Sequence, residues 1–253
     1  MQVPEGKKIY FASDFHLGIP DRATSVAREK RICNWLDIIK KDAAALYLVG
    51  DLFDTWFEYK HVVPKGHTRF LGKLAELSDA GLHIEAFTGN HDLWMRGYFE
   101  TELNIPVHHK PITREYNNKK FFIAHGDGLG PGDHGYKFLK KVLRSPLSQW
   151  IYRRLHPDTG VGLAGWFSRL GPKHIAEEDS FKGPEKEFLV QFCLETLKQE
   201  HFDYFLFGHR HITLEYPLPE NSLYVNLGDW LRYDSYAVFD GEDLRLEFFK
   251  AKE

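Results

Sequence analysis

Five short stretches of this chain place acidic, amide or imidazole side chains next to glycine, serine or alanine: SDFH, GDLFD, GNHD, AHGD and GHRH. Their seven candidate metal ligands are Asp14, His16, Asp51, Asn90, His125, His209 and His211. Oxygen and imidazole donors suit Mn, Fe or Zn, whereas structural zinc sites use thiolates. Seven ligands exceed the need of one ion but suit two ions that share a carboxylate. Because such a pair clamps a phosphate and activates water, the residues predict hydrolysis of a phosphate ester or pyrophosphate.

The elements that must position these ligands are short apolar runs, each followed by one of the five stretches. We expect strands at 7–13, 44–50, 82–89, 119–126 and 202–209. Sites in open α/β sheets gather beyond the carboxyl ends of the strands, so the ligands are expected to converge. Asp14 and His16 are two residues apart and share one face of an extended chain, as do His209 and His211.

Helical patterns alternate with these strands. We expect helices at 24–41, 66–81 and 181–200, and three further strands separated by turn residues within 212–249. This alternation, followed by antiparallel strands, predicts an α/β sandwich of mixed sheets. The 253 residues suffice for a single domain spanning 1–253.

The alternative interpretation is that these histidines are ordinary surface or core residues without a role in metal binding. The chain has 14 histidines, and we interpret seven of those outside the five stretches in that way: His61, His67, His83, His108, His109, His156 and His201. A lone DxH or GDxxD would carry little weight. Five stretches in order, each at a strand end, favour a metal site instead.

The composition is that of a soluble globular protein, with 43% hydrophobic and 27% charged residues. A net charge of −3 gives no overall attraction to nucleic acid or anionic lipid. We find neither a signal peptide nor an apolar run of 18 residues, and therefore expect a cytoplasmic protein.

The motif order DxH, GDxxD, GNHD, HGD and GHxH over residues 7–240 resembles the calcineurin-like metallophosphoesterases. The resemblance implies two mixed β-sheets flanked by helices, with two metal ions at the loops. By its pattern, one ion is held by Asp14, His16, Asp51 and His211. The other is held by Asp51, Asn90, His125 and His209, with Asp51 as the bridge.

The resemblance also assigns catalytic roles to two neighbours of these ligands. His91, in GNHD, matches the histidine that faces the substrate phosphate and protonates the leaving oxygen. Asp54 matches the carboxylate that orients it. A histidine paired with a carboxylate keeps its tautomer and its proton available near neutral pH, so the chemistry agrees.

Residues 127–180 are too long for a simple loop and predict a helical lid insertion of two or three short helices, with breaks at Pro146, 156–158 and 171–172. Between 137 and 173 the segment has eight Lys or Arg residues and one acidic residue, which implies an anionic partner. It is also rich in Leu, Trp and Phe. These side chains either pack the lid on the body, or line an acyl-chain groove or rest on a membrane.

A basic helical lid after HGD is similar to the UDP-2,3-diacylglucosamine pyrophosphatases of lipid A biosynthesis. The resemblance implies cleavage of a nucleotide-sugar lipid to UMP and 2,3-diacylglucosamine 1-phosphate, usually with manganese, and peripheral contact with the inner membrane through the lid. It implies these substrate contacts: Asn90, His91, Asp133, Tyr136, Ser180 and Lys182.

One departure keeps a second hypothesis open. That family carries arginine where this chain has His91, so the histidine either faces the phosphate in its place or marks a branch that acts on another nucleotide or phosphodiester. A catalytically inert metal scaffold is disfavoured because all seven candidate ligands are present. Nucleic acid is disfavoured because the basic residues are confined to one insertion. No obligate protein partner is implied.

Overall fold

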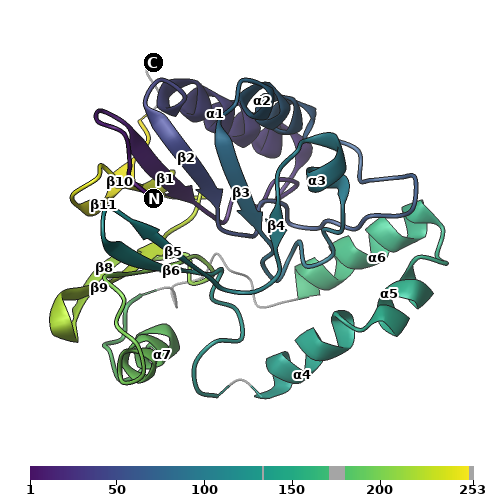
Figure 1. The fold of residues 1–253 in the computed structure, drawn as a ribbon. Helices are drawn as coiled ribbons and strands as arrows, with labels where there is room; N and C mark the ends of the chain where they lie inside the picture. Colours follow the sequence, from purple (N-terminus) through teal and green to yellow (C-terminus); the bar gives the residue numbers. More distant parts are fainter. Residues whose placement is uncertain (133, 171–179, 251–253) are drawn as a thin grey trace.

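The computed structural model describes residues 1–132, 134–170 and 180–250, and for residues 134, 136 and 166–170 it describes the backbone alone. Two mixed sheets face each other (Figure 1). The six-stranded sheet has the order β11 (Leu244–Phe248), β10 (Ser235–Phe239), β1 (Lys8–Ala12), β2 (Ala43–Leu48), β3 (His83–Phe87), β4 (Val107–His108). The five-stranded sheet has the order β5 (Ile112–Tyr116), β6 (Lys119–Ile123), β7 (Tyr204–Phe207), β9 (Ser222–Leu227), β8 (Thr213–Leu218). The α/β sandwich of mixed sheets is confirmed.

Parallel pairing brings the ends of the important strands to one edge of the sandwich. In the first sheet β1, β2, β3 and β4 run parallel, and in the second β6, β7 and β9 do. The loops that follow β1, β2, β3, β6 and β7 therefore emerge on the same side, where the candidate ligands lie.

Apolar side chains hold the layers together in three places. Helices α1 (Arg22–Ile39) and α2 (Thr68–Asp79) cover the outer face of the six-stranded sheet, and α7 (Phe188–Leu197) covers the outer face of the other (Figure 1). Between the sheets, the Phe11 ring lies 5.2 Å from Tyr47 and 6.0 Å from Phe121. Burial of these large rings excludes water from the interior and stabilises the stacked sheets.

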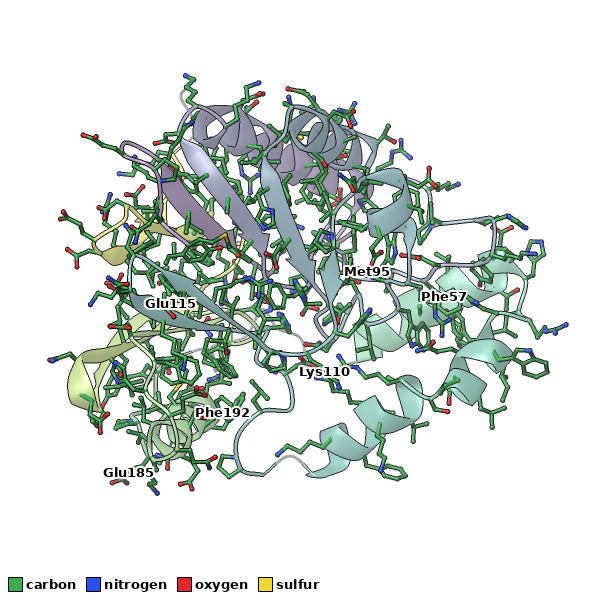
Figure 2. All side chains as sticks on the ribbon, in the orientation of Figure 1. Phe57, Met95, Lys110, Glu115, Glu185 and Phe192 are labelled. Carbon is green, nitrogen blue, oxygen red and sulfur yellow. The ribbon has the colours of Figure 1, made fainter. Side chains whose placement is uncertain are left out.

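Three further helices form an arm beside the sheets: α4 (His134–Leu143), α5 (Pro146–Tyr152) and α6 (Pro157–Leu170) (Figure 1). We call residues 134–170 the α4–α6 arm. The Trp94 indole donates to the Leu143 carbonyl at 2.9 Å, and the Arg153 guanidinium donates to the Glu58 carbonyl. The Tyr152 ring lies 4.5 Å from Phe57, a residue that Figure 2 places near α5 and α6. These contacts fix the arm to the body.

Some element boundaries differ from the sequence prediction. The helix expected at 181–200 begins at Phe188, because residues 183–186 form a turn closed by a bond from Lys186 N to Gly183 O. Glu187 stays extended and uses its buried carboxylate to pair with Arg210 at 3.0 Å. The prediction also missed β4, β5 and the short α3 (Tyr98–Glu102), and 212–249 contains four strands rather than three, with a 3₁₀ turn at Pro219–Asn221.

Candidate metal centre

Five loops bring the seven candidate ligands to one place. Asp14 and His16 follow β1, Asp51 follows β2, and the other ligands follow β3, β6 and β7. Among the described residues, three groups of three side chains could each hold a metal ion. Every side chain in a group offers one ligand atom, and the three ligand atoms of a group lie within 4.8 Å of one another. These groups are Asp14–His16–His211, Asp51–His125–His209 and His16–Asp51–His91. His and Asp side chains are thus positioned for metal binding.

The first group joins two parts of the chain that lie far apart in sequence, the loops after β1 and β7. His16 Nε2 lies 3.1 Å from His211 Nε2, and Asp14 Oδ1 lies 3.2 Å from His211 Nε2. Asp51 Oδ2 is 3.8 Å from His16 Nε2. Two buried imidazole nitrogens at this separation need a proton or a cation between them. A divalent ion fits this arrangement.

The second group shares Asp51 with the first. His125 Nε2 lies 3.1 Å from Asp51 Oδ2 and 3.3 Å from Asn90 Oδ1, and His209 Nδ1 lies 2.9 Å from Asn90 Oδ1. His125 Nδ1 donates to the Val49 carbonyl at 2.8 Å, which leaves Nε2 facing the carboxylate. Since one oxygen of Asp51 faces both groups, its geometry suits a bridge between two ions.

The backbone at the site is held in a conformation that L-residues adopt rarely. Five of the seven candidate ligands have positive φ: Asp14 (56°), His16 (42°), Asp51 (53°), His209 (67°) and His211 (51°). Left-handed conformations at non-glycine residues cost energy and cluster at functional sites. The folded structure therefore tolerates local backbone strain at the residues whose side chains converge in the candidate site.

Two glycines let the loops approach closely. A Cβ at Gly89 would clash with Asp51 Oδ1, and a Cβ at Gly208 would clash with Asp14 Oδ2. No side chain larger than hydrogen is tolerated there without displacing a candidate ligand.

The electrostatics favour positive charge in the cluster. Burial alone would lower the pKa of His16, but Asp14 and Asp54 raise it to about 10. The pKa of His125 is likewise opposed by burial and raised to about 10 by Asp51. At His209 burial prevails and, together with the charge of His125, lowers the pKa to about 4. Carboxylates that stabilise imidazolium in this way would also stabilise a bound cation.

One carboxylate beside the candidate ligands escaped the sequence analysis. Asp229, fully buried after β9, lies with Oδ2 3.5 Å from His211 Nδ1. Its carboxylate also accepts from Leu231 N at 2.9 Å and from Arg232 N at 2.7 Å. Gly228–Asp229 after a strand repeats the signal of Gly50–Asp51, and that pattern could have revealed it. A carboxylate on the far nitrogen of a ligating histidine fixes its tautomer and orientation.

His91 lies beside the cluster in partial contact with solvent. Its backbone N donates to Asp51 Oδ1 at 2.8 Å, and its ring lies 4.8 Å from that of His16. Its Nδ1 lies 3.0 Å from the Asp54 main-chain carbonyl and 3.5 Å from the Asp54 carboxylate. The carbonyl is therefore the nearer orienting group, although the sequence had suggested the carboxylate.

The remaining expected substrate contacts are placed less closely. Asp133 lies outside the described residues, and Tyr136 belongs to the first turn of α4, where the backbone alone is described. Ser180 and Lys182 are exposed, on either side of Phe181, whose ring packs 5.3 Å from Tyr216. In the described part of the chain, no hydrogen bond or ion pair joins Ser180 or Lys182 to the cluster.

Known proteins resemble the chain over nearly its whole length. It is 42% identical to a UDP-2,3-diacylglucosamine hydrolase of Porphyromonas gingivalis, over 97% of this chain and 99% of that one. It is 30% identical to a protein of the same name from Ectopseudomonas mendocina, over 92% and 95% of the two chains. Residues 7–213 match the family described as calcineurin-like phosphoesterase. With the metal-binding geometry, this match shows that the chain belongs to the calcineurin-like phosphoesterase family.

Proposed function

We propose that this enzyme hydrolyses the pyrophosphate of UDP-2,3-diacylglucosamine to UMP and 2,3-diacylglucosamine 1-phosphate. The observation that carries the proposal is the shared Asp51 oxygen between two groups of ligand atoms, an arrangement suited to phosphate chemistry. The substrate comes from relatives that carry the name UDP-2,3-diacylglucosamine hydrolase and align over nearly their full length. We also propose that residues 1–253 form one domain, with a helical lid insertion at residues 127–180.

The proposed cofactors are two divalent ions, with manganese as the first choice. Asp14, His16, Asp51 and His211 would hold one, and Asp51, Asn90, His125 and His209 would hold the other. When bound, the ions supply Lewis acidity that activates water and neutralises the phosphate oxygens. Asp51 would bind both ions and fix the distance between them, and Asn90 would orient the phosphate.

His91 is the proposed proton donor to the leaving oxygen. Its Nδ1 lies 3.0 Å from the Asp54 carbonyl, an acceptor that keeps the proton on that nitrogen and turns Nε2 away from Asp54. The carboxylate of Asp54 lies 3.5 Å from the same nitrogen and also helps to orient the ring. In this way the histidine can serve at the position where related enzymes carry arginine.

The α4–α6 arm is the proposed contact with the inner membrane. Its helices carry exposed apolar side chains, namely Phe138, Leu139, Val142, Leu147, Trp150, Ile151, Val161 and Leu163. Arg154 lies over the Trp150 ring at 4.7 Å, so positive charge accompanies the apolar surface. This combination suits an interfacial helix. Among the described residues, no helix is both long and apolar enough to cross a bilayer.

The experiment that tests the function is release of UMP from UDP-2,3-diacylglucosamine by the purified chain with Mn(II), with and without a chelator. We expect fast release that the chelator abolishes, and no release by Asp51→Ala. Hydrolysis of a simple aryl phosphodiester without UMP release would contradict the substrate assignment and favour another nucleotide or phosphodiester.

A further inference from the structure

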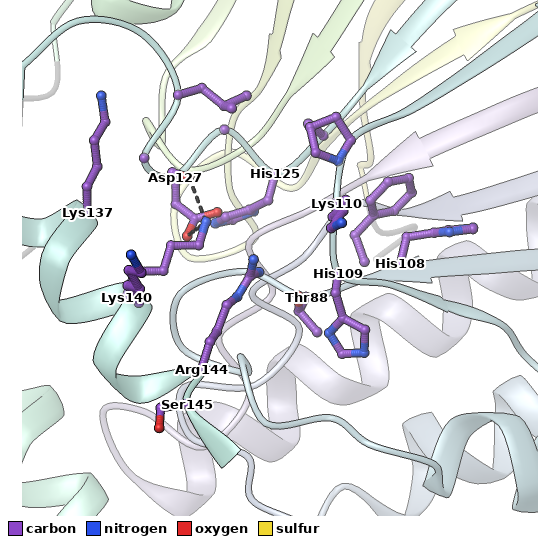
Figure 3. A pocket seen from close by; sticks show the side chains of 17 residues that line it. Thr88, His108, His109, Lys110, His125, Asp127, Lys137, Lys140, Arg144 and Ser145 are labelled. Carbon is purple, nitrogen blue, oxygen red and sulfur yellow. Dashed lines mark hydrogen bonds and ion pairs between the residues drawn. The ribbon is translucent and has the colours of Figure 1, made fainter. Parts of the chain in front are cut away.

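We propose that the cavity between β3, the β4–β5 loop and α4 binds the nucleotide half of the substrate, with Arg144 contacting its phosphate. The inference rests on the proposed function, which supplies the nucleotide. The cavity has a volume of about 460 Å³ and is lined in part by His125 of the second ligand group (Figure 3). A volume of this size suits a small ligand, and a molecule in it would lie beside the metal centre.

The lining of the cavity carries an excess of positive charge. Its cationic side chains are Lys110, Lys137, Lys140, Lys141 and Arg144. Of the described residues that line it, Asp127 is the only one with a carboxylate, and that group pairs with Lys140 Nζ at 2.6 Å. Figure 2 places Lys110 between the sheets and α4. Because one carboxylate cannot balance these cations, the cavity attracts an anion.

Arg144 differs from the other arginines on the α4–α6 arm whose side chains the structure describes. Arg153 donates to the Glu58 carbonyl, and Arg154 lies over Trp150. Within the described residues the Arg144 guanidinium has no hydrogen bond or ion pair, and its Nε is buried. Figure 3 shows this side chain extending into the cavity from the chain just after α4. A buried donor without a partner is costly, and a phosphate would satisfy the planar fork with two parallel bonds.

The two faces of α4 indicate which half of the substrate enters. Lys137 and Lys140 on α4, and Arg144 directly after its last residue, follow helical spacing and line the cavity. Phe138 and Val142 are absent from the lining and are 70% and 40% exposed. The substrate has the same division, since its nucleotide is charged and its acyl chains are apolar. The charged cavity therefore suits the nucleotide, and the acyl chains belong with the exposed apolar face.

A second unsatisfied group points the same way. Thr88 lines the cavity, and its buried hydroxyl has no hydrogen-bond partner among the described residues. Inorganic phosphate needs only the cationic groups. A nucleotide also presents ribose and base oxygens and nitrogens, to which a hydroxyl can donate or from which it can accept.

The test is calorimetric binding of UMP to the full chain loaded with Mn(II). Arg144→Gln is expected to weaken UMP binding roughly tenfold or more, as for a lost charge-assisted hydrogen bond, and to raise the KM for the UDP-linked substrate. Arg144→Lys keeps the charge but loses the fork, so an intermediate loss is expected. Arg22→Gln, which removes an exposed arginine at the start of α1, is the matched control and should bind UMP like the unmodified chain. Metal content and thermal unfolding of each variant check its fold.

Two results would overturn the inference. One is an Arg144→Gln variant, or an Arg144→Lys variant where the former fails to fold, that binds UMP as tightly as the control. The other is inorganic phosphate binding as tightly as UMP with the same dependence on Arg144, which would make the cavity an anion site without nucleotide recognition. Arg144-dependent UMP binding without hydrolysis of the lipid substrate would instead reject the proposed function and leave the nucleotide cavity standing.

Discussion

His16 and His211, 195 positions apart in the chain, bring their Nε2 atoms within 3.1 Å of each other. Each ring is buried and faces Asp14, so neither nitrogen has bulk water as an alternative partner. This contact closes the first ligand group and ties the loop after β1 to the loop after β7.

Replacing His16 by Ala should therefore remove one ion of the proposed pair. We expect the bound Mn(II) to fall from about two ions per chain to about one, because Asn90, His125 and His209 would still hold the other. Elemental analysis after gel filtration measures this directly. His201→Ala, at an exposed histidine, is the control. Two ions retained in His16→Ala would contradict the assignment.

Asp229→Asn should weaken metal binding without unfolding the protein. The asparagine keeps an oxygen for Leu231 N and Arg232 N but loses the negative charge that faces His211. The loss expected of such a partner is roughly 10- to 100-fold in metal affinity. Competition with a fluorescent chelator gives the affinity, and thermal unfolding of the metal-free variant provides the control. Unchanged affinity would show that Asp229 is structural only.

His91→Ala should keep both ions and lose turnover. General acid catalysis contributes typically 10²- to 10⁴-fold, so we expect kcat to fall by about 100-fold or more. Metal analysis is decisive here because His91 also lies within ligand distance of His16 and Asp51. Loss of an ion in the variant would make His91 a ligand and not a proton donor.

The exposed face of the α4–α6 arm should bind vesicles. Phe138 and Trp150 are 70% and 55% exposed, and their joint replacement by Ser should reduce co-sedimentation with anionic phospholipid vesicles by about tenfold or more. Phe248→Ser removes a half-exposed ring from β11, away from the arm, and should leave binding unchanged. An equal loss in both variants would refute a specific role of the arm.

Glu85 should make stability depend on pH in the acid range. Burial would raise its pKa, but bonds from His108, His83 and Arg114 hold it at about 2, below the ordinary 4.5. A lowered pKa in the folded state stabilises the protein above the unfolded value, and this contribution is lost as the pH falls from about 4.5 towards 2. Urea unfolding should show a loss of about 2 kcal/mol over that range, largely absent in Glu85→Gln. If the free energy of unfolding fell equally with pH in the unmodified chain and in Glu85→Gln, Glu85 would be excluded as the source of the pH dependence.

The strand-end motifs were enough to predict the α/β sandwich and the ligand types. Each motif follows an apolar run whose burial demands a strand, and the structure indeed places these residues after β1, β2, β3, β6 and β7. The start of α7 was missed because an ion pair between Glu187 and Arg210, distant in sequence, competes with local helical preference. Edge strand β5 was missed because its sequence, ITREY, contains no apolar run, and the strand gains its order from pairing with β6.

Local sequence alone determined which residues could bind metal, since ligand chemistry belongs to the side chain and strand ends are set by hydrophobic pattern. Only the tertiary structure decided that Asp229 lies behind His211 and that the Asp54 carbonyl lies nearest to His91. It also decided that Arg144, unlike Arg153 or Arg154, extends into a cavity beside His125. These relationships depend on how separate elements pack in three dimensions, and pairwise distances between remote residues are not encoded in any local pattern.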